Sequence, residues 1–312
     1  MDGASFRILF GIIFIATVAL FATTALAQAT ALTQTPTRTL ATAPSNSIDE
    51  GNSLPKYELG LGYTGIFVND YPGSNQLHYV WLPVPYFVYR GDFLRADRDG
   101  SMHGVFIDNA EVDIDASASG SVPVNDSQDE ARAGMPNIDW MGELGPRVLV
   151  HILRTSDYDL DASIPVRWVF STDLTRVDDR GFDFNPEIYL RRRAWFDRRG
   201  SLLAYYGALW GTSQLNRYFY EVTPQYATPD RPVYSAVPGY MYDYVGLSYR
   251  HDPSPTSPIV YFLGFSEAYM AGAANRDSPL MKSIENQEVF VGFIYDFYRS
   301  RARVSRRSGL EE

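Results

Sequence analysis

Apolar and polar side chains alternate along Asp157–Phe170, which reads DYDLDASIPVRWVF. One parity carries acidic, small or basic residues, including Asp159, Asp161 and Arg167, and the other carries Leu, Ile, Val, Trp and Phe. Successive side chains of a β-strand point to opposite faces, so a period of two predicts a strand with one polar and one apolar face.

The same alternation recurs along most of the chain. It is clear in Tyr57–Phe67, Asp139–Arg154, Gly181–Phe196 and Asn286–Phe297, and turn signals such as Asp99-Gly100 separate the segments. No stretch shows a convincing helical period. The twelve strands that the pattern predicts cover residues 57–67, 75–89, 92–98, 101–108, 110–121, 139–154, 157–171, 180–196, 200–214, 239–251, 257–270 and 286–298.

Two architectures are compatible with many alternating strands, a soluble sandwich and a membrane barrel. Sandwich strands usually have about five or six residues, whereas membrane-spanning strands need about nine to eleven and carry aromatic residues at both interfaces. Many segments here have ten or more residues, and Tyr, Phe and Trp make up 14% of the chain. Charges recur opposite the apolar face, which suits a water-filled lumen. We therefore expect an all-β fold, an antiparallel transmembrane β-barrel of about twelve strands and of bacterial outer-membrane type.

The N-terminal residues 1–29 have the layout of a cleaved secretory signal peptide rather than a membrane anchor, because a short apolar run is followed by small residues. The segment 30–56 is rich in Thr, Ala, Pro and Ser and is expected to be a disordered linker. Residues 57–298 would form the barrel, and 299–312 a disordered basic tail. The expected location is the bacterial outer membrane.

Composition argues against several kinds of function. A net charge of −10 disfavours a nucleic-acid role, and the absence of cysteine excludes disulfides and cysteine-bound metals. The four histidines occur singly, without the spacing of a metal motif, and no glycine-rich phosphate loop is present. We expect a protein that is not an enzyme and has no cofactor or metal site.

The charged positions on the polar parity are the first candidate site. In the predicted barrel these side chains face the lumen, where they could pair with one another and plug it or line a path for a small solute. Sequence alone leaves both roles open. The candidate residues are Glu143, Arg147, His151, Asp159, Asp161, Arg167, Glu187, Arg191 and Arg193.

The segment 215–240 is the second candidate site. It is too long for a tight hairpin, and its four prolines interrupt any central strand. With twelve strands and both termini in the periplasm, this connection would be extracellular. Its aromatics would cap the barrel mouth or bind a partner, or would only pack the loop against the rim. They are Tyr218, Tyr220, Tyr226 and Tyr234.

Three blocks of sequence carry a family resemblance. They are GLGYTGIFVNDYPGSNQLHYVWLPVPYFVYRGDFLRA at 60–96, LNRYFYEVTPQYA at 215–227 with RPVYSAVPGY at 231–240, and NRDSPLMKSIENQEVFVGFIYDF at 275–297. The last block ends in GFIYDF, which resembles the C-terminal assembly signal of outer-membrane barrels. In this order and spacing, the blocks resemble the MipA/OmpV outer-membrane proteins over about residues 57–298.

The resemblance implies a barrel in contact with outer-membrane lipid and lipopolysaccharide. The namesake of the family is a scaffold that links a murein lytic transglycosylase to a bifunctional murein synthase, so a scaffold or adaptor for cell-envelope enzymes is the first expectation. Other members resemble adhesion or permeability proteins. The alternative is accordingly a pore or small-solute channel with a charged lumen.

Overall fold

The computed structural model describes residues 53–90, 94–96, 102–108, 111–121, 129–196, 199–254 and 257–305. These residues form a sheet of thirteen strands and a second sheet of two. The strands are β1 Ser53–Pro55, β2 Tyr57–Asn69, β3 Leu77–Arg90, β4 Leu94–Ala96, β5 Met102–Asp108, β6 Val112–Ser121, β7 Trp140–Arg154, β8 Tyr158–Thr172, β9 Val177–Phe184, β10 Glu187–Trp195, β11 Gly200–Gly211, β12 Gly239–His251, β13 Ile259–Tyr269, β14 Glu285–Arg299 and β15 Arg303–Ser305.

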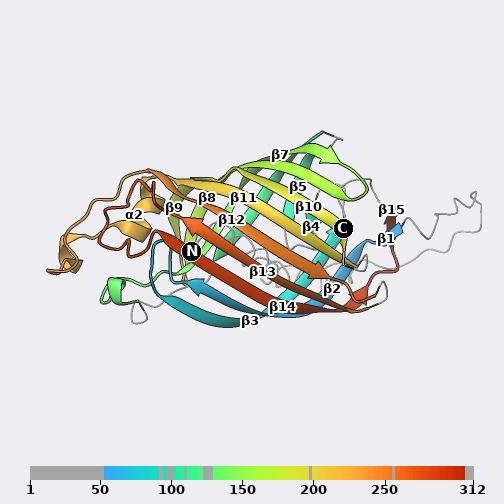
Figure 1. Cartoon of the computed structure of the whole chain (residues 1–312), viewed down its shortest axis with the longest axis horizontal. Helices are drawn as coiled ribbons and strands as arrows, with labels where there is room; N and C mark the ends of the chain where they lie inside the picture. The colour runs from blue at the N-terminus through green and yellow to red at the C-terminus, as the bar shows by residue number, and fades with distance from the viewer. Residues whose placement is uncertain are drawn as a thin grey trace, which may run out of the picture.

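The larger sheet closes into an antiparallel barrel (Figure 1). Strand β14 pairs with β2, for example through Gly292 and Thr64, so the last barrel strand joins the first. Strands β9 and β10 both lie between β8 and β11, and Asn185-Pro186 separates them along one line of the wall. If β9 and β10 are taken as one interrupted strand, the barrel has the twelve strands that the alternation predicts, and that prediction is confirmed.

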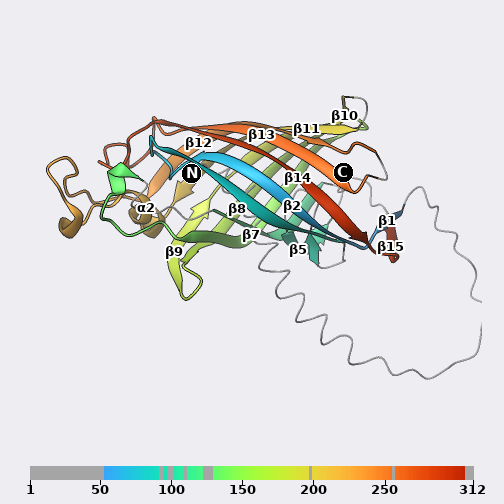
Figure 2. The same cartoon turned by 90° about the horizontal axis from the view of Figure 1, so that it is seen from below.

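The two ends of the barrel differ. The end called here the loop end carries the long connections after β2, β6, β11 and β13, and these connections contact one another, as in the 2.7 Å hydrogen bond from Tyr71 Oη to the Leu280 carbonyl. The opposite end, called here the turn end, carries short connections such as 155–157. Figure 2 shows β1 and β15 beyond the barrel at the turn end.

The small sheet alters the expected borders of the barrel. Leu54 pairs with Val304 in an antiparallel register, so the last residues of the expected linker and part of the expected tail are ordered against each other. Through this pairing, the backbone N–H and C=O groups of β1 and β15 obtain the hydrogen-bond partners that neither segment would have on its own. The expected signal peptide and most of the linker, within 1–52, lie outside the described residues, as do 306–312.

Apolar side chains cover the outside of the barrel. On β14, Val289, Val291, Phe293 and Tyr295 are exposed while the residues between them point inward. Aromatic rings stack across this face, as in the Tyr63–Trp81 pair. Such a continuous apolar belt is suited to lipid, and closure of the sheet pairs the backbone groups that lipid could not satisfy.

One helix was not predicted from the sequence. Helix α2, Ser213–Tyr220, follows β11 and buries Leu215, Phe219 and Tyr220 on one face. Eight residues make only about two turns, too few for the period of 3.6 to stand out from the surrounding aromatic sequence. In the described part of the chain, no helix is long and apolar enough to cross a membrane.

The interior of the barrel differs from place to place, and towards the turn end Tyr86, Val88, Val260 and Ile294 form a small apolar cluster of their own. At the loop end an apolar core fills the barrel, formed by inward residues of the strands together with residues of α2 and the long connections. Towards the turn end the inward side chains of β6, β7, β8 and β10 are mostly charged or small. The apolar core includes Ile66, Val68, Met141, Val169, Leu209, Leu215, Phe219, Tyr220, Met241, Tyr242, Met270 and Leu280.

Candidate functional site

Two features could carry function. The first is a row of charged side chains on the inner face of β6, β7, β8, β9 and β10, called here the charged wall. The second is the set of packed connections at the loop end, called here the cap. The alternation of each strand explains the wall, because every second residue faces inward.

The centre of the wall is a buried ion cluster. Arg167 lies with Nη1 2.5 Å from Oε2 of Glu143 and 3.2 Å from Oδ2 of Asp183, and its Nε donates to Ser117 Oγ at 3.2 Å. The Arg167 side chain is only 1% exposed. A charge buried this deeply is tolerated only when it is paired, so these strands hold one another through Arg167.

A second pair lies next to this cluster, nearer the turn end. Arg147 Nε lies 2.9 Å from Asp115 Oδ1, and Arg147 Nη2 lies 2.5 Å from Asp115 Oδ2. The two residues are direct partners in the β6–β7 register. The fork geometry matches a carboxylate with two parallel hydrogen bonds, which makes this a strong and directional pair.

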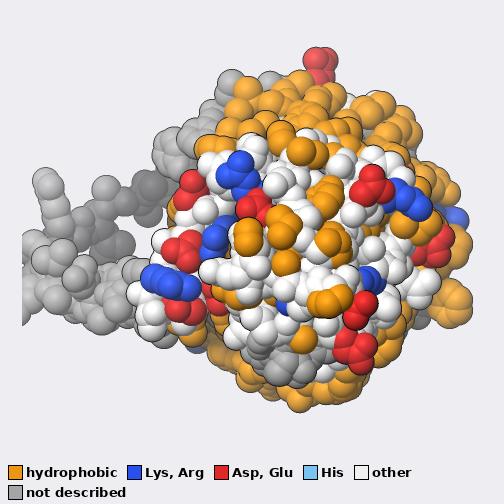
Figure 3. Space-filling model, turned by 90° about the vertical axis from the view of Figure 1, so that its left-hand side faces the viewer, with side chains coloured by type: hydrophobic (Ala, Val, Ile, Leu, Met, Phe, Trp, Pro, Cys, Tyr) orange, Lys and Arg blue, Asp and Glu red, His pale blue; other side chains and the backbone are white. Residues whose placement is uncertain are grey.

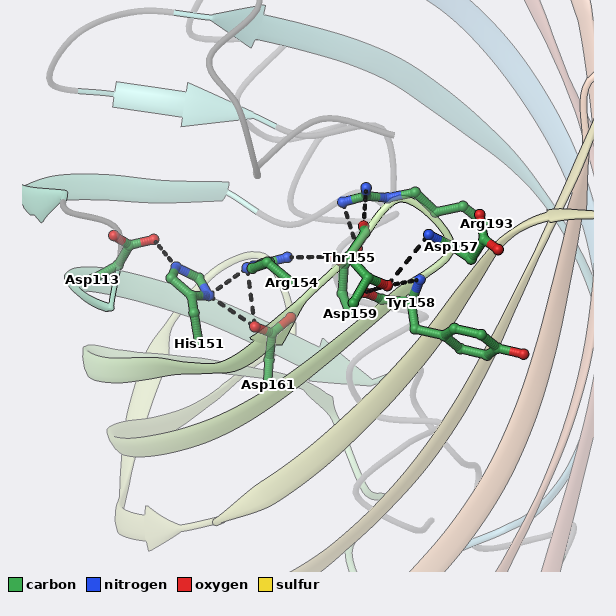
Figure 4. A network of polar contacts seen from close by, with 9 residues as sticks. All are labelled: Asp113, His151, Arg154, Thr155, Asp157, Tyr158, Asp159, Asp161 and Arg193. Atoms are coloured by element: carbon green, nitrogen blue, oxygen red, sulfur yellow. Dashed lines mark hydrogen bonds and ion pairs between the residues drawn. The ribbon is translucent and has the colours of Figure 1, made fainter.

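His151 lies between two carboxylates near the turn end (Figure 4). Its Nδ1 is 2.8 Å from Asp161 Oδ1, and its Nε2 is 3.1 Å from Asp113 Oδ2. The Arg154 guanidinium also contacts Nδ1. The three strands β6, β7 and β8 are thus joined through one imidazole.

The network continues through Asp159 to β10. Asp159 Oδ1 lies 3.3 Å from Arg154 Nη1, and Asp159 Oδ2 lies 2.6 Å from Arg193 Nη2. Arg193 Nη1 also donates to the Thr155 carbonyl at 3.3 Å. Arg191 is on the same inward parity, and its register partner on β8 is Asp159. The wall therefore brings oppositely charged neighbours together rather than like charges.

Glu187 has two tyrosine partners. The Tyr244 and Tyr189 hydroxyls both donate to its carboxylate. Tyr244 reaches it from β12 across β11, and Gly207 of β11 leaves the space: a Cβ there would lie 2.5 Å from Tyr244 Oη and 2.6 Å from Glu187 Cγ. Gly207 is required here for close approach, a role the sequence did not reveal.

The predicted loop aromatics all lie in the cap, and Tyr218 also stacks under the Arg180 guanidinium of β9, whose Cζ is 4.1 Å from the ring centroid. Tyr220 is fully buried, and burial raises the pKa of its phenol, so it stays neutral. Tyr218 Oη accepts from the Asp139 amide at 2.8 Å, and Tyr234 Oη donates to Asn275 Oδ1 at 3.3 Å. Tyr226 is half-buried against the apolar core. These contacts make the rings part of the cap, and whether they also bind a partner stays a prediction.

Two arginines that sequence reasoning missed hold the cap together. Arg231 donates to the carbonyls of Ala131 at 2.8 Å and Ala133 at 3.1 Å, which belong to another connection. Arg132 donates to the Phe219 carbonyl at 3.0 Å. Both bind backbone carbonyl groups of distant segments, and no sequence pattern marks such a partner.

The cap closes the loop end of the barrel. In Figure 3, which looks onto this end, the connections form a continuous surface. Beneath α2 lies a cavity of about 10 Å³, room for roughly one water molecule. Glu143 lines it together with Leu215 and Phe219, so the apolar core sits directly on the Arg167 cluster.

The described residues contain no group of three or more His, Asp or Glu side chains that could hold a metal ion. The charged residues of the wall pair with one another across β6, β7 and β8, and these contacts hold the strands in register.

Comparison with solved structures finds outer-membrane barrels at low identity. The NanC porin is 7% identical with a TM-score of 0.35, over 77% of this chain and 100% of the porin. An outer membrane channel from Pseudomonas putida is 12% identical with a TM-score of 0.44, over 81% of this chain and 100% of that one. A FadL homologue from Pseudomonas aeruginosa is 10% identical with a TM-score of 0.29, over 79% and 91%. These likenesses concern the barrel fold alone.

Comparison of the sequence gives the family. No curated protein sequence matches the chain. Residues 61–297, almost the whole barrel, match the family model described as MltA-interacting protein MipA. The chain therefore belongs to the MipA family of outer-membrane β-barrel proteins.

Proposed function

We propose that this barrel is a closed, non-enzymatic scaffold that docks cell-envelope enzymes at its turn end. The observation that carries the proposal is the closed loop end, where an apolar core and a hydrogen-bonded cap occupy the mouth. A barrel whose mouth is filled in this way is better suited to anchoring partners at the membrane than to passing solutes.

The turn end is the side on which we infer that partners bind. Outer-membrane barrels keep short turns in the periplasm and long loops outside, which would put the turn end and the chain ends in the periplasm. The family description names an interaction with MltA. The scaffold hypothesis proposes two partners for the turn end, a murein lytic transglycosylase and a murein synthase.

Matched insertions test the proposal. One flexible insertion goes into the turn at 155–157, and the same insertion goes into the cap near Asp230, which is exposed. Binding of a purified murein lytic transglycosylase to the immobilised protein is then measured for each variant and for the unaltered chain. We expect the turn-end insertion to weaken binding and the cap insertion to leave it unchanged. The reverse pattern, or no binding by the unaltered protein, would remove the proposal.

A pore is the second candidate, and the charged wall favours it. Ser119 and Ser163 are buried on the inner face, and their hydroxyls have no hydrogen-bond partner among the described residues, as expected where ordered water lies in the lumen. Under this reading the cap would be a gate. Planar-bilayer recording distinguishes the two functions: the scaffold predicts no steady conductance from the unaltered protein, whereas the pore predicts charge-selective conductance.

A variant in which a short Gly-Ser linker replaces 213–238 serves as the control for that recording. It removes α2 and the following loop while leaving the strands on either side intact. If this variant conducts and the unaltered protein does not, the closed mouth is the reason that the unaltered protein shows no steady conductance. Steady conductance by the unaltered protein would favour the pore.

A further inference from the structure

Arg192 differs from the arginines of the charged wall because it lies on the outside of the barrel. The outward positions of β10 are Ile188 and Leu190, which are 41% and 43% exposed, and Arg192 follows them on the same face. It is exposed and lies close to the turn end, with Tyr158 of β8 as its register partner. The apolar stripe of β10 thus ends in a guanidinium.

Two aromatic rings hold this guanidinium. Arg192 Cζ lies 4.2 Å from the ring centroid of Trp195 and 5.5 Å from that of Tyr158. The β10–β11 register is irregular between Arg192 and Trp195, and Ala194 in this stretch has a φ of 51°. The Trp195 indole that contacts Arg192 comes directly after this irregularity. In Figure 4, Tyr158 points away from the lumen network, and it is 37% exposed.

Among the described residues, the side-chain N–H groups of Arg192 have no hydrogen-bond acceptor. In the described part of the chain, no carboxylate pairs with it, whereas Arg147, Arg167 and Arg193 each have an acidic partner. Contact with aromatic rings occupies the face of a guanidinium and leaves the N–H groups at its edge directed outwards. With respect to the described residues, the site therefore presents a positioned fork of donors without an acidic partner.

The position along the barrel indicates which acceptor would be present. An arginine on the lipid face is costly at the bilayer midplane but costs little near the interfaces. Aromatic rings such as Trp and Tyr settle at the level of the head groups. A guanidinium at that depth meets phosphate groups, which its fork geometry binds with two parallel hydrogen bonds.

We propose that Arg192, Tyr158 and Trp195 form a binding site for the phosphate of a phospholipid head group in the leaflet at the turn end. Trp195 and Tyr158 fix the guanidinium, Arg192 donates to the phosphate oxygens, and Ile188 and Leu190 lie below to contact the acyl chains. The site is independent of the lumen and of the proposed scaffold function.

Native mass spectrometry of the purified full-length protein in detergent, titrated with phosphatidylglycerol, tests the site. We expect Arg192→Gln to lower lipid affinity roughly tenfold, since it removes charge-assisted hydrogen bonds. Arg192→Lys keeps the positive charge but lacks the forked guanidinium. Its lipid affinity should lie between those of the unaltered protein and Arg192→Gln. Trp195→Leu should also weaken binding, because the guanidinium loses its main support. Retention of the heat-modifiable gel shift confirms that each variant is folded.

Controls separate the phosphate from other sources of binding. Arg176→Gln removes an exposed arginine at the loop end that already pairs with Asp173 and Asp178, and it should leave lipid binding unchanged. Diacylglycerol, which lacks the phosphate, should bind equally weakly to the unaltered protein and to Arg192→Gln, and free inorganic phosphate should not displace the lipid. Equal phosphatidylglycerol binding by the unaltered protein and Arg192→Gln would overturn the proposal, as would an equal loss in Arg176→Gln.

Discussion

Arg167 donates from Nη1 to Oε2 of Glu143 at 2.5 Å, and Glu143 also lines the small cavity beneath α2. One carboxylate thus belongs both to the charged wall and to the floor of the apolar core. This contact joins the part of the barrel that resembles a soluble protein core to the part that is polar. A substitution in the charged wall is therefore expected to affect the packing of the apolar core, and a substitution in the core is expected to affect the wall.

Replacement of Arg167 by methionine is expected to destabilise the barrel by about 3–5 kcal/mol, because Glu143 and Asp183 would remain buried without their cation. Urea unfolding in phospholipid vesicles, followed by tryptophan fluorescence, measures the free energy of unfolding. The control is Arg176→Met, at an arginine whose side chain is 64% exposed, where the change should stay within about 0.5 kcal/mol. Equal effects at the two sites would contradict the buried cluster.

The outward face of β8 is predicted to lie in lipid. Val166 is 45% exposed, and an arginine there should cost about 2–4 kcal/mol if the position is near the bilayer midplane. Val166→Leu keeps the apolar character and should change stability by less than about 1 kcal/mol. The same unfolding experiment compares the variants, and a harmless Val166→Arg would mean that this face meets water.

Gly207 is predicted to tolerate no side chain. A Cβ would lie 2.5 Å from Tyr244 Oη and 2.6 Å from Glu187 Cγ, so Gly207→Ala should cost about 1–3 kcal/mol through forced displacement of that pair. At Gly272 the nearest atom to a new Cβ is 3.5 Å away, and Gly272→Ala is the matched control. The idea fails if both alanine variants unfold at the same urea concentration as the unaltered protein.

The cap is predicted to weaken as the pH rises. Burial raises the pKa of the Asp129 carboxyl, and the neighbouring Asp70 carboxylate raises it further. The folded protein therefore binds a proton more tightly than the unfolded chain does. The contribution of Asp129 is complete below the unfolded pKa and is lost as the pH rises through the folded pKa.

Asp129→Asn tests that prediction, because an amide still accepts from the amides of Ala131 and Arg132 but does not titrate. The free energy of unfolding, measured between about pH 3 and pH 8, should fall less steeply with rising pH in the variant. Asp173 is the control, because hydrogen bonds from Thr175 lower its pKa to about 2. Its contribution to stability is therefore lost as the pH falls, which is the opposite of the dependence expected for Asp129. Parallel curves for Asp129→Asn and the unaltered protein would show that Asp129 does not link the cap to pH.

The sequence predicted the barrel well because alternation is a local signal that lipid and lumen impose on every strand. It could not predict which charges meet. His151 finds Asp161 only because the register places them opposite each other, and a slip of one residue would turn every side chain to the other face. The cap was harder still: α2 is too short to show its period, and Arg231 binds carbonyl oxygens, which every residue carries.

The pairing of β1 with β15 has a consequence for chain order. Ser53 and Ser305 are register partners at the turn end, so the first and last described residues lie within about 6 Å of each other. The segment 53–305 consequently forms a nearly closed loop, so we expect the barrel to tolerate a different order of its strands along the chain. A short linker from residue 305 to residue 53, with new termini opened at 255–256, should give a circular permutant with the same strand order around the wall.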